Sequence, residues 1–211
     1  PRRPRPQQRA EPADLLESDQ TVWKAFLLAN KAMLITRSRA DWLNLNESSR
    51  PADPAVAPGS IKWRPFQLGF ILMCISGIGN PDDIEDRRLV DLLWFPTGGG
   101  KTEAYLAIAA TEIFYRRIRY GEEGIGTAVI KRYTLRLLTT QQFERAATLI
   151  CACELLRGKD PKPLGDERIS LGLWIGRDSS PNNFEKALER FEEVRGDHKP
   201  KNPFVLQKCP W

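Results

Sequence analysis

Apolar residues along this 211-residue chain follow two periods, and the periods predict where helices and strands lie. From Ala13 to Ile35 they recur at helical spacing, which predicts one helix, or two helices broken near Gln20. Short apolar runs without that spacing predict buried strands, and helical patterns separate them. The predicted strands are 89–94, 127–130 and 169–175, and the helices that follow them are 101–120, 139–157 and 182–194. Such alternation predicts an α/β fold with a parallel, doubly wound sheet and a ligand at the carboxyl ends of the strands.

Polar stretches divide the chain into three regions. Residues 1–12 hold four prolines and four arginines without apolar periodicity, which predicts a disordered basic arm. Residues 13–60 are predicted to form a helical accessory segment and, from Asn46 onward, a linker rich in Ser, Pro, Ala and Gly. Residues 61–211 contain the predicted strands and therefore form the main domain.

A glycine-rich loop joins the first predicted strand to its helix. Successive glycines let backbone N–H groups surround a polyanion without Cβ clashes, and the helix start adds unpaired donors and its positive dipole end. A lysine after the glycines can reach the β- and γ-phosphates of a nucleotide, and the next hydroxyl can bind Mg²⁺. The predicted nucleotide-binding residues of the loop are Thr97, Gly98, Gly99, Gly100, Lys101 and Thr102. Lys101 and Thr102 take the catalytic role, and Thr102 is the predicted magnesium ligand.

The loop departs from the general phosphate-loop pattern at one position, where Phe95 stands in place of the first glycine. Motor ATPases of the helicase type often carry Pro-Thr-Gly-x-Gly-Lys-Thr without that glycine, and residues 96–102 match this form. The alternative is a glycine-rich turn that happens to end in Lys-Thr. The strand predicted before the loop and the helix predicted after it favour phosphate binding.

The segment Trp63-Arg64-Pro65-Phe66-Gln67 is a second candidate for nucleotide contact. In helicase-like motors an Arg-Pro-aromatic-Gln segment precedes the first motor strand, and the glutamine amide can offer adenine both a donor and an acceptor. Arg64 and Gln67 are therefore added to the predicted nucleotide site. The alternative is a plain helix start with Pro65 in its first turn.

Hydroxyl, arginine and amide side chains follow the second predicted strand, in residues 131–142. A strand end of this kind followed by a helix start can hold one strand of nucleic acid by its phosphates. Thr134, Arg136 and Gln141 are the candidates here. The alternative is that Thr139 and Thr140 only cap the next helix.

Composition narrows the class of protein without deciding it. Hydrophobic residues make up 41% of the chain, no apolar run reaches the ~18 residues of a membrane span, and no signal-peptide pattern is present, so we expect a cytoplasmic protein without membrane contact. Four cysteines at irregular spacing do not suggest a disulfide framework. A net charge of +5 is compatible with a polyanionic partner. The chain begins with proline and ends within a pattern, as a piece of a longer protein would.

With these motifs in order, residues 63–211 resemble the first motor domain of a superfamily 2 helicase. The matching motifs are the Q-type motif at 64–67, motif I at 96–102, motif Ia at 136–141 (Arg-x-Leu-x-x-Gln), and the start of motif Ib at 173–176, with Gly176 as a further nucleic-acid contact. The segments 95–105, 132–139 and 172–176 are more closely similar to the helicase subunit of DISARM-type anti-phage systems. The resemblance implies a RecA-like P-loop domain in which helices flank a parallel sheet.

The same resemblance implies an ATP- and Mg²⁺-dependent helicase or translocase that acts on nucleic acid, DNA rather than RNA, beside a partner subunit of the defence system. Such motors use an Asp-Glu pair at a strand end for hydrolysis, and Asp166-Glu167 follows a polar loop instead. We therefore expect these residues alone to bind ATP without appreciable turnover. Cys209-Pro210 resembles the first half of a Cys-Pro-x-Cys zinc knuckle, so Cys209 is a candidate Zn²⁺ ligand in a longer protein.

Two other functions compete with the motor. One is a P-loop NTPase of another class, which would not need the Arg-Pro-Phe-Gln segment or the Arg-x-Leu-x-x-Gln helix start. The other is a non-catalytic scaffold that uses a motor-like domain as a docking surface.

Overall fold

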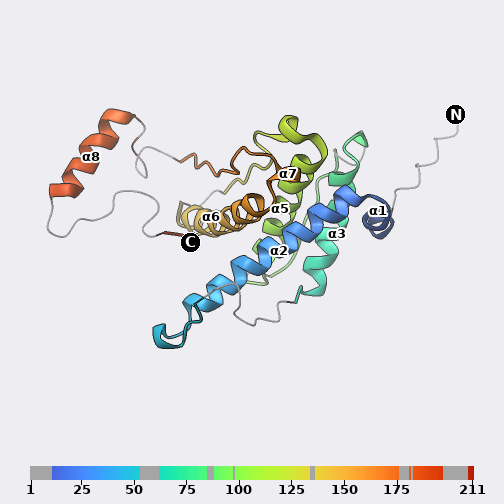
Figure 1. Ribbon diagram of the computed structural model, residues 1–211, viewed down its shortest axis with the longest axis horizontal. Helices are drawn as coiled ribbons and strands as arrows, with labels where there is room; N and C mark the ends of the chain where they lie inside the picture. The colour runs from blue at the N-terminus through green and yellow to red at the C-terminus, as the bar shows by residue number, and fades with distance from the viewer. Residues whose placement is uncertain are drawn as a thin grey trace.

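A computed structural model describes residues 11–52, 62–84, 88–96, 98–133, 136–175, 181, 183–196 and 209–211, without the side chains of 136–139 (Figure 1). The predicted basic arm lies outside this range except for its last two residues. The α-helices are α1 (Pro12–Ser18), α2 (Gln20–Leu43), α3 (Pro65–Gly79), α5 (Lys101–Tyr120), α6 (Arg136–Lys159), α7 (Pro161–Leu164) and α8 (Phe184–Gly196). Two short 3-10 helices are η1 (Glu47–Ser49) and η3 (Gly121–Gly124).

The N-terminal helical pattern forms two helices, α1 and α2, which agrees with the second of the two predicted alternatives, a break near Gln20. Asp19 lies at the break and caps α2, because its Oδ1 accepts hydrogen bonds from the backbone N–H groups of Thr21 (2.7 Å) and Val22 (3.2 Å). An N-cap carboxylate satisfies donors that have no partner inside the helix. The break therefore has a local cause in one residue.

Four helices form the core. α2 packs against α5 and α6, and α3 packs against α5 (Figure 1). The buried face of α2 is made largely of small residues, with Ala25, Ala29 and Ala32 at most 1% exposed, so the helices can approach closely. Phe114 of α5 and Ile71 and Ile75 of α3 are bulky buried side chains of the same cluster. The N-terminal helix thus belongs to the central core.

The predicted parallel sheet is wrong for the part of the chain that the structure describes. None of the segments predicted as strands forms a strand in the described residues, and the RecA-like sheet is not seen. A sheet requires backbone hydrogen bonds between neighbouring extended segments, and these segments make none to one another. The run 89–94 is also not buried, since Val90, Leu92 and Trp94 are 93%, 83% and 87% exposed.

A buried arginine fixes the path of the chain after α7. Arg117 of α5 is 6% exposed, and its guanidinium donates to the backbone carbonyls of Leu164 (3.4 Å), Glu167 (2.9 Å) and Arg168 (3.3 Å). A buried charge needs such partners. These bonds hold the start of the extended segment 168–175 against the C-terminal part of α5.

None of the described helices is long and apolar enough to cross a membrane.

Glu154 of α6 secures the same region from the other side. Its carboxylate accepts hydrogen bonds from Arg157 Nε (2.7 Å), Arg157 Nη2 (3.0 Å) and the backbone N–H of Ile169 (2.6 Å). Burial by itself raises the pKa of Glu154, but the hydrogen bonds from Arg157 and Ile169 outweigh it and the net pKa is lowered. The ionised carboxylate is therefore the form that the fold stabilises.

We expect Glu154→Gln to lower the free energy of unfolding at neutral pH by about 1.5–3 kcal/mol, the usual contribution of hydrogen bonds to a charged group. Because the folded-state pKa is depressed, the contribution of Glu154 is present above its ordinary value of 4.5 and is lost as pH falls through the folded-state pKa. Urea unfolding at several pH values measures this. Glu185→Gln on the exposed α8 removes the same charge and is the control. Equal pH profiles for the two variants would contradict the assignment.

Candidate phosphate-binding site

The glycine loop and the first turn of α5 form the junction that the sequence predicts. α5 begins at Lys101 and ends at Tyr120, which confirms the predicted helix. Gly98 (φ 81°) and Gly100 (φ 90°) adopt left-handed backbone conformations that side chains disfavour. The N–H of Gly99 donates to the carbonyl of Pro96 at 3.1 Å, which closes the turn. The loop therefore delivers the chain to a helix N-terminus whose backbone donors have no partner inside the helix.

Arg64 and Gln67, at the start of α3, hold the loop from one side. Arg64 Nη1 donates to the carbonyl of Gly99 and Gln67 Nε2 donates to the carbonyl of Gly100, both at 2.7 Å. Gln67 Oε1 accepts a hydrogen bond from the backbone N–H of Arg64 at 2.9 Å, so both ends of the amide are bonded within the protein. Gln67 is 5% exposed. The Arg-Pro-Phe-Gln segment thus contacts the glycine loop directly, and adenine recognition by Gln67 stays a prediction.

Two aromatic rings reinforce this contact. Phe66 of α3 and Phe95 stack with ring centroids 4.1 Å apart and an interplanar angle of 23°. Stacking of aromatic rings adds to the energy of burying them. Phe95 occupies the position where the general phosphate-loop pattern has glycine, and in this structure it joins the loop to α3.

Lys101 and Thr102 occupy the first turn of α5. Lys101 Nζ donates to the carbonyl of Phe95 and, at 3.2 Å, to that of Pro96, so its ammonium lies over the beginning of the loop. Neutral carbonyls are weaker partners for an ammonium than a phosphate oxygen is. Thr102 is half-buried beside it, and its role as a magnesium ligand stays a prediction. Thr97 lies outside the described residues.

An ion pair that the sequence analysis did not predict joins the same turn to α6. Arg145 Nη2 bonds Glu103 Oε1, across 42 positions of the chain. The two side chains are 41% and 38% exposed, so the pair contributes little to stability and its main effect is to fix geometry. The pKa of the nearby Lys131 is lowered, first by burial and to a lesser extent by the positive charge of Arg145. A contact between residues so distant in sequence has no signature in local periodicity.

The residues predicted to contact nucleic acid are only partly placed. α6 begins at Arg136, although the side chain of Arg136 lies outside the described set, and Gln141 is exposed on the second turn. Thr139 and Thr140 lie inside α6, so the alternative that they cap it is wrong. Thr134 and Gly176 are also outside the described residues.

The C-terminal residues 209–211 lie against the helices. The Thr148 hydroxyl of α6 donates to the carbonyl of Pro210 at 3.0 Å, and the Arg39 guanidinium of α2 lies 3.9 Å from the centroid of the Trp211 ring. Cys209 is exposed next to them. Within the described ranges, no three His, Cys, Asp or Glu side chains gather as a metal site would require, and the zinc role of Cys209 stays a prediction.

We expect Gly100→Ala to destabilise the loop. A left-handed backbone costs an L-residue about 1–2 kcal/mol, and a Cβ on Gly100 would lie 2.8 Å from Gln67 Nε2. Gly69→Ala is the matched control, since a Cβ there meets nothing within 4 Å and alanine favours the helix. Chemical denaturation should show a lower free energy of unfolding for Gly100→Ala than for the wild type, and no such decrease for Gly69→Ala. Equal stability of the two variants would contradict the described loop geometry.

Comparison with known proteins gives one informative match. No protein-family model matches the chain. Over 179 residues the chain is 38% identical to the DISARM protein DrmA of Bacillus paralicheniformis, a stretch that covers 82% of this chain and 16% of that protein. The chain therefore spans about a sixth of the length of the curated relative that it matches, and the similarity supports a relation to the DISARM protein DrmA.

Proposed function

We propose that this chain is the nucleotide-binding part of an ATP-dependent nucleic-acid motor, a helicase or translocase that acts on DNA in bacterial anti-phage defence. The observation that carries the proposal is the glycine loop, which leads into Lys101 and Thr102 at the start of α5 and is held by Arg64 and Gln67. A signalling or assembly ATPase of another class would need the loop but not the hydrogen bonds that Arg64 and Gln67 of α3 make to it. The similarity to DrmA supports the defence role.

The geometry suggests how the loop would hold a triphosphate. The backbone N–H groups at the start of α5 point away from the helix and are suited to phosphate oxygens. Lys101 would exchange the carbonyls of Phe95 and Pro96 for the β- and γ-phosphates, and Arg64 and Gln67 would keep the loop in shape while it does so. Thr102 offers a hydroxyl to Mg²⁺, an oxygen ligand of the kind that this ion prefers. When bound, Mg²⁺ neutralises phosphate charge and acts as a Lewis acid.

Hydrolysis requires more than these residues. A motor of this class uses an Asp-Glu pair near the phosphates, whereas Asp166 and Glu167 lie in the turn after α7, where their carbonyls accept from Arg157 and Arg117. We therefore expect ATP binding without appreciable turnover from residues 1–211. The test is ATP–Mg²⁺ binding by the wild type and Lys101→Ala, together with DNA-stimulated hydrolysis by the full-length protein. Equal binding by both forms would overturn the nucleotide site.

DNA contact is expected through the start of α6. Arg136→Ala should weaken binding of every single-stranded sequence alike and should reduce the slope of log affinity against log salt by about 0.7–0.9, the contribution of one phosphate contact. Fluorescence anisotropy with labelled single strands at several salt concentrations measures both quantities. Arg119→Ala, at the exposed end of α5, removes the same charge and is the control. If the two variants behave alike while both stay folded, the Arg136 assignment fails.

A further inference from the structure

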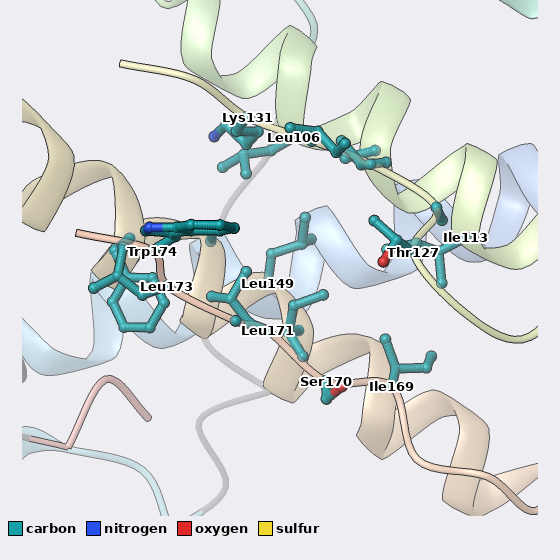
Figure 2. A pocket seen from close by; sticks show the side chains of 18 of the residues that line it. Leu106, Ile113, Thr127, Lys131, Leu149, Ile169, Ser170, Leu171, Leu173 and Trp174 are labelled. Carbon is teal, nitrogen blue, oxygen red and sulfur yellow. The ribbon is translucent and has the colours of Figure 1, made fainter. Parts of the chain in front are cut away.

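A large cleft lies on the side of α5 and α6 away from α2 and is distinct from the glycine loop (Figure 2). Its volume is about 1220 Å³. The two extended segments 125–133 and 167–175 border it, and side chains of α5 and α6 form its floor. Figure 2 shows Lys131 and Trp174 toward one end of the cleft, with Thr127 and Ile169 toward the other.

The walls of the cleft are mainly apolar. Leu106 of α5 and Leu149 of α6 line it and are almost fully buried, whereas Ile130 and Trp174 on the two segments are 87% and 100% exposed. Along 169–175 burial alternates with a period of two: residues 169, 171, 173 and 175 are covered at least in part, and residues 170, 172 and 174 are exposed. This is the pattern of a strand with one covered and one open face. Exposed apolar area of this kind marks a binding surface.

Most of the backbone of the two segments makes no hydrogen bond within the part of the chain that the structure describes. The backbone N–H and C=O groups of 127–133 and 170–175 form no hydrogen bond with another described residue. Backbone groups of extended segments are regularly satisfied by an added strand, which gains affinity from main-chain hydrogen bonds. The bordering segments therefore offer an extended peptide both apolar contacts and hydrogen-bonding groups.

One cation in the cleft has no hydrogen-bond partner among the described residues. It is Lys131 Nζ, which is buried 5.5 Å from the centroid of the Tyr133 ring. The charged group that faces it from α6 is Arg145, whose own carboxylate partner is Glu103 of α5. A buried ammonium beside a second cation is costly unless an anion joins it. The chemistry at this end of the cleft favours a carboxylate.

We infer that the cleft binds an extended apolar segment of the same, longer polypeptide, with an Asp or Glu side chain that pairs with Lys131. Segment 127–133 has seven residues, and at ~3.3 Å per residue an occupant of about six or seven residues would match it. The source follows from the match to DrmA, whose aligned part is only 16% of that protein and leaves most of its length to supply such a segment. The inference does not depend on nucleotide binding at the glycine loop.

Zero-length coupling tests the carboxylate. A water-soluble carbodiimide joins an amine to a carboxyl that it touches, with loss of water, and mass spectrometry of the full-length protein locates the bond. We expect Lys131 coupled to an Asp or Glu outside residues 1–211, and the product absent from Lys131→Gln. Lys24, whose Nζ lies 3.9 Å from Asp160 Oδ2, provides the internal positive control in both proteins. Coupling of Lys131 to a carboxyl within residues 1–211, or no coupling while Lys24 reacts, would overturn the inference.

Two further measurements distinguish a segment of the same polypeptide from a second copy of the protein and from an empty cleft. Mixing ¹⁴N- and ¹⁵N-labelled protein before coupling detects a second copy, since mixed-isotope products would place another molecule in the cleft and overturn the inference. Hydrogen exchange of the unmodified proteins needs no variant. The amides of 127–133 and 170–175 should exchange at least tenfold more slowly in the full-length protein than in residues 1–211. Equal exchange rates in the two proteins would equally overturn it.

Discussion

Lys101→Ala should raise the dissociation constant for ATP–Mg²⁺ at least tenfold, which corresponds to about 1.4 kcal/mol. The reason is that, among the described residues, the hydrogen-bond partners of the Lys101 ammonium are the neutral carbonyls of Phe95 and Pro96, so an arriving triphosphate gains a charge-assisted hydrogen bond at little cost. Isothermal titration calorimetry at fixed ionic strength measures the change. Because this ammonium lies at the loop itself, its removal should weaken ATP binding more than the removal of a distant lysine does.

Lys24→Ala is the matched control for this experiment. Lys24 lies on α2 and makes an exposed ion pair with Asp160, with side chains 47% and 62% exposed, so its loss changes net charge by the same amount without touching the loop. Wild-type affinity in Lys24→Ala and weakened affinity in Lys101→Ala would support the phosphate site. If both variants bind ATP as the wild type does, the glycine loop is only a turn that connects Phe95 to α5.

Phe114→Ala should lower the free energy of unfolding by about 3–5 kcal/mol, the usual cost of removing a buried phenyl group. Phe114 of α5 is 0% exposed and lies in the core that α2, α3 and α6 complete. Since domains of this size are typically stable by about 5–15 kcal/mol, the variant should sit near its unfolding midpoint in mild denaturant. Guanidinium unfolding followed by circular dichroism measures it.

Phe191→Ala supplies the comparison. Phe191 lies on α8 and is 51% exposed, and Figure 1 shows α8 apart from the central helices. Its truncation should change stability by less than about 0.5 kcal/mol, as surface substitutions usually do. If Phe191→Ala lowers the free energy of unfolding as much as Phe114→Ala does, the core is not where the structure places it.

Local sequence patterns succeeded where the information is local. The start of α5 at Lys101 is set by residues within one helical turn and was predicted, and the break at Asp19 agrees with one of the two predicted alternatives. Arg64 and Gln67 were assigned to the nucleotide site only because they belong to a motif, and their contact with the glycine loop was not predicted. The sheet prediction failed because an apolar run such as 89–94 indicates a tendency to be covered, whereas a strand also needs a hydrogen-bonding neighbour that periodicity cannot supply. Arg117 and the Arg145–Glu103 pair were missed because their partners are more than 40 positions away.

The small-residue face of α2 sets a limit on how far the chain can be shortened. Ala25, Ala29 and Ala32 lie against α5 and its neighbours with almost no exposed surface, so removing α2 would leave bare the apolar surface of α5 that those alanines cover. A shortened protein that begins at residue 62, just before the Arg-Pro-Phe-Gln segment, would keep every motif of the nucleotide site. It would nevertheless be expected to aggregate, because exposed core surface drives association. The smallest autonomous folding unit is therefore larger than the span of its motifs, and its N-terminal boundary lies before Asp19.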